Sequence, residues 1–249
     1  MPYVVASDAE PFLRSLPDRS VDLFLIDPPY CNTARPLWEK QWDDPAAYTS
    51  WLVGLGSIAR DKVRRTGSLI VFQPLGKHGH HPIFDVIRGL EESWHFRNWI
   101  TWKRNRAPAK NKTYPNCRDE ILWFSASADD SLVTFNVPFL DQAPKRPGKT
   151  PLKKVTNVWD DVPQVFRPTR VCERPLPLIA RLIKTHSDPG ELIVDFFSGS
   201  GTTGIVAHNL GRRFLGCEAI AEDAEAADGR VTAAKRVAGA DSVTPQRRK

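Results

Sequence analysis

The chain has 249 residues and a formal net charge of +6, and 41% of its residues are hydrophobic and 26% charged. This length suits one large α/β domain with an insertion, and no apolar run reaches the roughly 18–20 residues that a membrane span needs. The N-terminus has no basic stretch followed by an apolar core, so we find no secretory signal and expect a cytoplasmic protein with an acidic partner.

The first half of the chain alternates between strands and helices. Val21-Asp-Leu-Phe-Leu-Ile26 is almost continuously apolar, which is typical of a buried parallel strand. Asp27-Pro-Pro-Tyr30 ends it, because the two prolines cannot donate to a sheet ladder. Gly67 opens a later strand. We predict strands over residues 3–6, 21–26 and 68–73, and helices over residues 10–16, 46–65 and 82–93.

The second half continues this alternation after one long interruption. Residues 126–170 have no clear hydrophobic period, and so long a stretch without regular structure in a compact domain is usually functional. Pro175 suits the first turn of the helix that follows. We predict strands over residues 97–103, 120–125, 192–196 and 213–218, and helices over residues 175–186, 202–210 and 221–237.

This order of elements predicts an α/β fold with a mostly parallel sheet covered by helices on both faces. Such sheets bind ligands at the carboxyl ends of their strands. We assign residues 1–125 and 171–240 to a core, residues 126–170 to an inserted region, and residues 241–249 to a basic tail.

A glycine-rich segment follows one of these predicted strands. It reads Asp195-Phe-Phe-Ser-Gly-Ser-Gly-Thr-Thr203, in which the glycines let the backbone approach a ligand and the helix start supplies free N–H groups. Glu218 ends the next strand, where an acid is placed to bind ribose hydroxyls. Together these features predict a cofactor that contains a nucleoside, without identifying it.

The segment from Asp27 to Tyr30 offers two hydrogen-bond acceptors at a strand end, the Asp27 carboxylate and the Pro28 carbonyl. An exocyclic amine of a nucleobase has two hydrogens to donate to such a pair. Tyr30 adds a flat face on which a base can stack. We name Asp27, Pro28, Pro29 and Tyr30 as candidate catalytic residues, with a purely structural turn as the alternative.

Two runs of basic residues contain no acid, and Asn and Pro separate their charges. This pattern is typical of a nucleic-acid footprint, although a solvated loop surface is an equal alternative. No cysteine or histidine pattern predicts a metal site. The basic residues are Lys103, Arg104, Arg106, Lys110, Lys112 and Arg118 in the first run, and Lys145, Arg146, Lys149, Lys153 and Lys154 in the second.

The order of these segments resembles the amino-methyltransferases of DNA, in particular the permuted subgroup (beta class) whose catalytic motif precedes the cofactor motif. Three departures are visible: Phe196 replaces the usual proline, Asp119 stands where a histidine often occurs, and Ser7 replaces a glycine. Arg174 matches the lysine of the family's Lys-Pro. The matching segments are Ser7-Asp8, Ser20-Val-Asp-Leu23, Asp27-Pro-Pro-Tyr30, Ile100-Thr-Trp-Lys103, Glu120-Ile-Leu-Trp123, Arg174-Pro175 and residues 195–203.

The resemblance implies a Rossmann-like, circularly permuted fold with S-adenosylmethionine as cofactor. It implies methyl transfer to the amine of a base flipped out of double-stranded DNA, with residues 126–170 as the target-recognition region. It puts Asp8 near the cofactor's adenine and Glu218 at its ribose. The methionine part would be surrounded by Arg174, Pro175, Asp195, Phe196, Phe197, Ser198, Gly199, Ser200, Gly201, Thr202 and Thr203.

The resemblance also bears on which base is methylated. In the family, aspartate at the head of the motif goes mostly with adenine N6 and serine mostly with cytosine N4, so Asp27 favours adenine. Cytosine N4 methylation, a DNA-binding relative without catalysis, and an NAD-dependent oxidoreductase are the alternatives. The sequence leaves open whether the protein forms a homodimer, as the subgroup often does, or has a restriction endonuclease partner.

Overall fold

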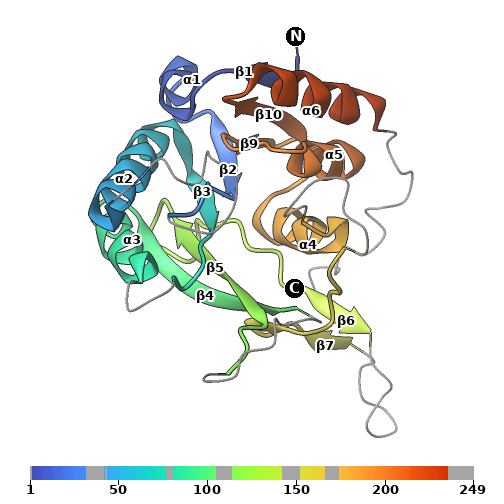
Figure 1. Cartoon of the computed structure of the whole chain (residues 1–249). Helices are drawn as coiled ribbons and strands as arrows, with labels where there is room; N and C mark the ends of the chain where they lie inside the picture. Colours follow the sequence, from blue (N-terminus) through green and yellow to red (C-terminus); the bar gives the residue numbers. More distant parts are fainter. Residues whose placement is uncertain are drawn as a thin grey trace, which may run out of the picture.

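The computed structural model describes residues 2–31, 42, 44–76, 81–104, 114–141, 152–165 and 174–234. Strands and helices alternate through most of this part of the chain (Figure 1). In chain order the elements are β1 (Val4–Ala6), α1 (Ala9–Ser15), β2 (Val21–Ile26), α2 (Pro45–Lys62), β3 (Val63–Phe72), α3 (Pro82–Leu90), β4 (His95–Lys103), β5 (Arg118–Ser125), β6 (Phe139–Asp141), β7 (Leu152–Lys154), β8 (Val158–Trp159), α4 (Leu176–His186), β9 (Leu192–Asp195), α5 (Thr202–Asn209), β10 (Arg213–Glu218) and α6 (Ala221–Ala233).

Eight of the strands form one sheet in the order β1-β10-β9-β2-β3-β5-β4-β8. β5 runs antiparallel to both of its neighbours, whereas the other neighbouring pairs are parallel. The prediction of a mostly parallel α/β sheet is therefore confirmed, with one reversed strand that the pattern of elements does not predict. Because β5 is reversed, its first residues lie at the same edge as the carboxyl ends of β2 and β3.

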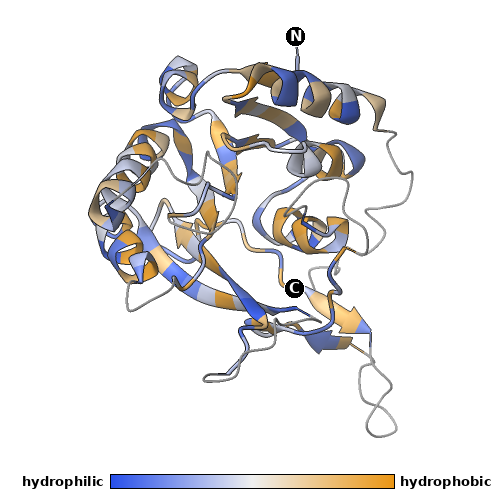
Figure 2. Ribbon diagram, in the orientation of Figure 1, coloured by the Kyte–Doolittle hydropathy of each residue, from blue (hydrophilic) through white to orange (hydrophobic). Residues whose placement is uncertain are grey.

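The sheet is buried between two layers of helices, with α1, α2 and α3 on one face and α4, α5 and α6 on the other (Figure 1). Alternate side chains of β2 point to opposite faces: Phe24 and Ile26 pack in one core, and Leu23 and Leu25 in the other. The helices alternate hydrophobic and hydrophilic residues along their ribbons, as expected for elements with one face on the core (Figure 2).

The boundary between α2 and β3 differs from its prediction. The predicted helix reaches residue 65, whereas α2 ends at Lys62 and β3 begins at Val63. Gly67 lies within β3 rather than before it, and a Cβ there would lie 2.5 Å from the Asp22 carbonyl oxygen. The pairing of β2 with β3 shifts register at this point. Gly67 therefore allows two strands to approach closely at an irregularity. In the sequence, a glycine at this position looks like the end of a helix.

The predicted inserted region, residues 126–170, contributes to the sheet. β8 pairs with β4, Trp159 is buried, and the Trp102 indole donates to the Val162 carbonyl at 2.8 Å. β6 and β7 form a separate two-stranded sheet. The hydrophobic pattern predicts none of these short strands, because two or three residues are too few to show a period.

At the end of the described part, α6 stops at Ala233, four residues before the predicted end of that helix. The predicted basic tail lies outside the described residues. Among the residues that the structure describes, no helix combines the length and apolar character of a membrane span.

Candidate active site

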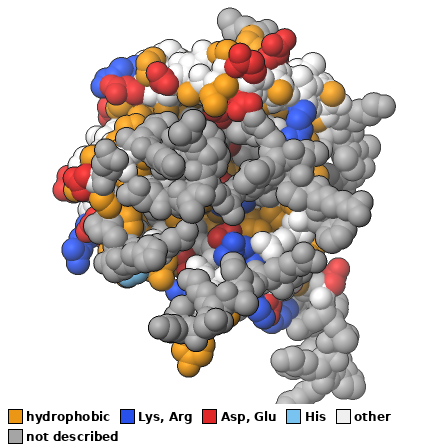
Figure 3. Space-filling view, in the orientation of Figure 1, with side chains coloured by type: hydrophobic (Ala, Val, Ile, Leu, Met, Phe, Trp, Pro, Cys, Tyr) orange, Lys and Arg blue, Asp and Glu red, His pale blue; other side chains and the backbone are white. Residues whose placement is uncertain are grey.

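A cavity of about 1130 Å³ opens at the carboxyl edge of the sheet. Its lining comes from the segment after β9, the end of β10, the start of α1 and the end of β2. Asp8, Asp27, Asp195 and Glu218 therefore face one continuous space, although they are separated by up to 210 positions in the chain. Figure 3 shows acidic and basic side chains beside one another near the centre of one face of the molecule.

The glycine turn, residues 196–203, forms one wall of this cavity. Gly199 and Gly201 have φ angles of 51° and 79°, which favour glycine. The Gly199 N–H donates to Glu218 Oε2 at 2.9 Å, so the acid at the end of β10 anchors the turn. A Cβ at Gly216 would lie 2.1 Å from Ser198 Oγ, so this position of β10 also needs glycine.

Phe196, at the position where the family that the sequence resembles usually has proline, is 1% exposed and packs edge-on against Phe24. The side chain points into the core rather than out to solvent. Phenylalanine in place of proline therefore adds a ring to the core that contains Phe24, and the glycine turn still lines the cavity.

Acidic side chains outnumber basic ones in the described lining of the cavity. Six carboxylates, from Asp8, Glu10, Asp27, Asp195, Glu218 and Asp223, line it together with two arginines, Arg14 and Arg174. Burial raises the pKa of Asp195 to about 7, against hydrogen bonds from Thr203 and Phe197 that lower it, and nearby Asp27 and Glu218 raise it further. A cationic ligand would relieve this concentration of negative charge. S-adenosylmethionine, with a sulfonium and an ammonium against one carboxylate, fits that requirement.

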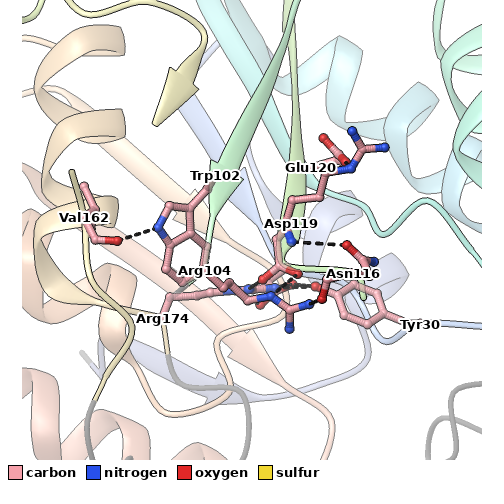
Figure 4. Close-up of polar contacts among 10 residues, drawn as sticks. Tyr30, Trp102, Arg104, Asn116, Asp119, Glu120, Val162 and Arg174 are labelled. Carbon is pink, nitrogen blue, oxygen red and sulfur yellow. Dashed lines mark hydrogen bonds and ion pairs between the residues drawn. The ribbon is translucent and has the colours of Figure 1, made fainter. Parts of the chain in front are cut away.

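At the other end of the cavity, Asp27 is held by Arg174. The arginine Nε donates to Asp27 Oδ2 at 2.7 Å, and its Nη2 donates to Asp27 Oδ1 at 3.0 Å and to the Tyr30 hydroxyl. The Tyr30 hydroxyl in turn donates to Asp27. The arginine Nη1 donates to Asp119 Oδ2 at 2.7 Å, and Figure 4 shows Arg174, Asp119 and Tyr30 directed toward one another.

The charge states of this cluster follow from its contacts. Burial alone would lower the pKa of Arg174, but Asp27, Tyr30 and Asp119 raise it well above its ordinary value. Burial raises the pKa of Tyr30 well above its ordinary value, and Asp27 adds to this while Arg174 opposes it. The guanidinium is therefore charged and the phenol protonated at neutral pH, and both act as donors toward Asp27.

Most of the residues that the sequence predicts for catalysis and cofactor binding line this cavity. Pro28 is buried, and Pro28, Tyr30, Pro175 and Gly201 are absent from the lining. Pro175 caps α4 rather than starting its first turn, and Gly201 packs against α6. The predicted residues in the lining are Asp8, Asp27, Pro29, Arg174, Asp195, Phe196, Phe197, Ser198, Gly199, Ser200, Thr202, Thr203 and Glu218.

The basic residues predicted to contact DNA have different surroundings. Arg104 lies 3.6 Å from Asp119, and Arg118 forms a 2.7 Å ion pair with Glu120, so acids on β5 partly neutralise both. Lys103, Lys153 and Lys154 are exposed. Arg106, Lys110, Lys112, Lys145, Arg146 and Lys149 lie outside the described residues.

Sequence reasoning missed several lining residues. Trp51 on α2, Phe72 at the end of β3 and Ile179 on α4 face the cavity, and the pattern of their helices and strands marks them only as core positions. Ala219 and Ile220 also line it, and their place directly after Glu218 is the one signal that could have found them. Within the described residues, no group of His, Cys, Asp and Glu could hold a metal ion.

Solved structures with this architecture define the class of protein. The chain is similar to TTHA0409 of Thermus thermophilus, with a TM-score of 0.67, 25% identity, and coverage of 94% of this chain and 96% of that one. TTHA0409 has also been solved in complex with S-adenosylmethionine, and that structure matches with a TM-score of 0.64. The cytosine-N4-specific PvuII DNA methyltransferase matches with a TM-score of 0.66 at 16% identity, over 93% of this chain and 92% of that one. The fold is that of a methyltransferase that uses S-adenosylmethionine.

The sequence comparisons specify the family. The pattern of the DNA methylase family matches residues 21–228. The chain is also 30% identical to the type II methyltransferase M1.MboII of Moraxella bovis over 240 residues, which cover 85% of this chain and 89% of that protein. The chain belongs to the DNA methylase family, and is therefore a DNA methyltransferase dependent on S-adenosylmethionine.

Proposed function

We propose that this protein is a site-specific methyltransferase that acts on adenine N6 in double-stranded DNA and belongs to the permuted subgroup of the family. The observation that carries the proposal is Asp27, which heads the Asp-Pro-Pro-Tyr segment and opens into the cavity that the glycine turn lines. In the chain this segment precedes the glycine turn, which is the order of the permuted subgroup. The aspartate, where serine would favour cytosine, directs the proposal to adenine.

The chemistry of the target amine explains why an acceptor pair is needed. Bound S-adenosylmethionine supplies an activated methyl group, so the difficulty lies with the amine, whose lone pair is delocalised into the ring. Asp27 accepts one amine hydrogen at the cavity, and the proposed acceptor of the other is the carbonyl of Pro28, which is buried beside Asp27 and outside the described lining. These bonds localise the lone pair and stabilise the positive charge that develops on nitrogen. The Asp27 carboxylate has about four acceptor sites, so it can bind the amine while Arg174 and Tyr30 hold it.

The remaining proposed assignments come from the family resemblance, and they are supported by the fact that the residues line one cavity. Glu218 binds the ribose, Asp8 lies by the adenine of the cofactor, and Asp195 with the glycine turn surrounds the methionine part. Arg174 links the cofactor end of the cavity to the target-amine end, because it lines the cavity and also binds Asp27. The target base enters after flipping out of the duplex, which costs a few kcal/mol of pairing and stacking. Tyr30, the stacking surface expected from the sequence, lies outside the described lining and contacts Asp27 through its hydroxyl.

Sequencing the genomic DNA of a host that expresses the protein, with detection of modified bases, tests this proposal. We expect methylated adenine at one short recurring sequence, and no such modification in a matched host that expresses Asp27→Asn. Methylated cytosine at a recurring sequence would show that the target is cytosine N4 instead of adenine N6. Methylated adenine without a recurring sequence would contradict site specificity.

The affinity for S-adenosylmethionine should depend on pH through Asp195. With a pKa of about 7 in the ligand-free protein, Asp195 is mostly protonated at pH 6 and ionised at pH 8. A ligand with net positive charge binds the ionised form, so below pH 7 binding must displace the proton. We expect the dissociation constant to be about 10-fold higher at pH 6 than at pH 8, which means weaker binding at the lower pH.

Calorimetry at both pH values measures this effect, and Asp195→Asn is the matched control. The variant is shape-conserving and cannot titrate at this position, so titration of the cofactor's own amine affects both proteins alike. The wild type should show the additional 10-fold change due to Asp195, and the variant should lack it. An identical pH dependence in both proteins would remove Asp195 from the cofactor site.

Residues 126–170 are the proposed target-recognition region, and Lys153 and Lys154 are the basic side chains that the structure describes in it. Both lysines are exposed on β7. We expect Lys153→Ala/Lys154→Ala to weaken binding to all DNA sequences alike and to reduce the slope of log affinity against log salt by about two. Binding titrations at several salt concentrations measure the slope. Lys62→Ala, at the carboxyl end of α2, is the control and should keep the wild-type slope. A loss confined to one DNA sequence would show that the lysines read bases instead.

A further inference from the structure

The strongest unassigned feature beside the cavity is the way Asp119 engages Arg174. All three guanidinium nitrogens of Arg174 are bound: two contact Asp27, and the third, Nη1, donates to Asp119 at 2.7 Å. The arginine side chain is 12% exposed and that of Asp119 is 21% exposed. This is a partly buried charge network rather than a pair of solvated surface side chains, so its geometry is restricted.

The topology of the sheet explains how Asp119 reaches this position. Asp27 follows β2, and β3 lies between β2 and β5. Since β5 runs in the opposite direction, its second residue, Asp119, lies beyond the carboxyl end of β3, where Ile121 pairs with Phe72. Asp119 thus stands at the edge where Asp27 ends its own strand. Arg174, just before α4, spans the gap between the two carboxylates (Figure 4).

A third contact restricts where the guanidinium can lie. Its Cζ is 4.6 Å from the centre of the Phe72 ring, which comes from β3 between the two acids. The guanidinium lies over the Phe72 ring, and its Nη1 is bound to Asp119. Its Nε–Nη2 edge therefore faces the two oxygens of Asp27. A guanidinium presents its donors in a rigid plane, so fixing Nη1 fixes the opposite edge as well.

We propose that Asp119 is a positioning residue, which orients Arg174 so that its guanidinium holds the Asp27 carboxylate in the plane needed to accept the target amine. This inference rests on the proposed role of Asp27. It also accounts for two positions that differ from the family pattern, because the residues at 119 and 174 bind each other here. Arg104, 3.6 Å from Asp119, connects the same acid to the loop between β4 and β5.

Kinetics of Asp119→Asn test the proposal, because the substitution keeps the size of the side chain and removes its charge. We expect kcat to fall about 10- to 100-fold, as a small misplacement of a reacting group can cost. The KM for S-adenosylmethionine should change less than about twofold, since Asp119 does not line the cavity. The test measures methyl transfer to whichever base the enzyme uses, so its result does not depend on whether the target is adenine or cytosine.

Asp22→Asn is the matched control. Asp22 is also a carboxylate of the sheet bound by an arginine, at 3.2 Å from Arg64, but it lies near the start of β2. Its loss should lower stability without changing kcat of the folded enzyme. A kcat that falls equally in both variants would mean that Asp119 has a structural role alone, and would overturn the proposal.

A double-mutant cycle with Arg174→Lys tests whether Asp119 acts through the arginine. Lysine cannot hold Asp27 with two parallel bonds, so kcat should fall in this variant, and adding Asp119→Asn should then change it little. Independent effects that multiply in the double variant would overturn the proposal.

A crystal structure of Asp119→Asn gives a readout that needs no activity. We expect Arg174 to lose at least one of its two bonds to Asp27. Unchanged bonds would overturn the inference. An inactive wild type would instead count against the proposed function, and the crystal structure would still decide the role of Asp119.

Discussion

Replacing Asp27 with alanine should lower kcat for DNA methylation by about 100- to 1000-fold, which is the scale of losing one preorganised contact to a developing charge. The carboxylate accepts an amine hydrogen in the proposed mechanism, and no neighbouring acid can replace it. Asp119, which binds the same arginine, does not line the cavity, and Asp195 belongs to the proposed cofactor end of it. The fold should survive, because Arg174 keeps its bond to Asp119 and its contact with Phe72.

Binding of S-adenosylmethionine should remain close to wild type in Asp27→Ala. Asp27 is one of the charges that raise the pKa of Asp195, so its removal shifts that pKa downward and leaves more ionised carboxylate for the cofactor at neutral pH. Single-turnover kinetics and calorimetry separate the two effects. If cofactor affinity falls as much as methyl transfer does, Asp27 belongs to the cofactor site and the proposed mechanism is wrong.

Replacing Glu218 with alanine should have the opposite profile, with a loss of cofactor affinity of about 1.5–3 kcal/mol, or about 10- to 150-fold in the dissociation constant. A carboxylate bound to ribose hydroxyls makes charge-assisted hydrogen bonds of this strength. Glu218 also accepts from the N–H groups of Gly199 and Ala219, at 2.9 and 3.1 Å. Its removal therefore frees the glycine turn as well as the ribose.

A cofactor analogue without ribose hydroxyls separates these two contributions. Wild-type protein should bind the analogue more weakly than S-adenosylmethionine, whereas Glu218→Ala should bind both with similar affinity. Calorimetry gives both dissociation constants. A variant that still discriminates between the two ligands as strongly as the wild type would place the ribose elsewhere.

The parts of the fold that sequence reasoning predicts well are those with an unbroken local signal. β2 and β10 have the predicted bounds, because each is a mostly apolar run whose carboxyl end is marked by an acid or by the prolines that follow. The end of α2 carries no such signal. Arg64 and Arg65 resemble a basic helix end, and Gly67 resembles a stop, but the register shift opposite β2 decides their conformation. Tertiary contact overrides local preference at this point.

The candidate site divides in the same way. The glycine turn, Glu218 and Asp27 lie at strand ends, so the topology of an α/β sheet brings them together and their convergence could be predicted. The orientation of Arg174 toward Asp27 could not, because it depends on the reversal of β5 and on the ring of Phe72. Trp51 reaches the cavity from α2 through a cluster with Phe197 and Trp42, and no spacing in the sequence marks such a contact.

The most direct test of adenine N6 methylation is an analysis of the product. Purified protein is incubated with duplex DNA and S-adenosylmethionine carrying a labelled methyl group, the DNA is digested to nucleosides, and the labelled nucleoside is identified by mass spectrometry. Asp27→Ala provides the blank. We predict label in N6-methyladenine with the wild-type protein and none above background with the variant. Label in N4-methylcytosine, or equal labelling by both proteins, would contradict this account.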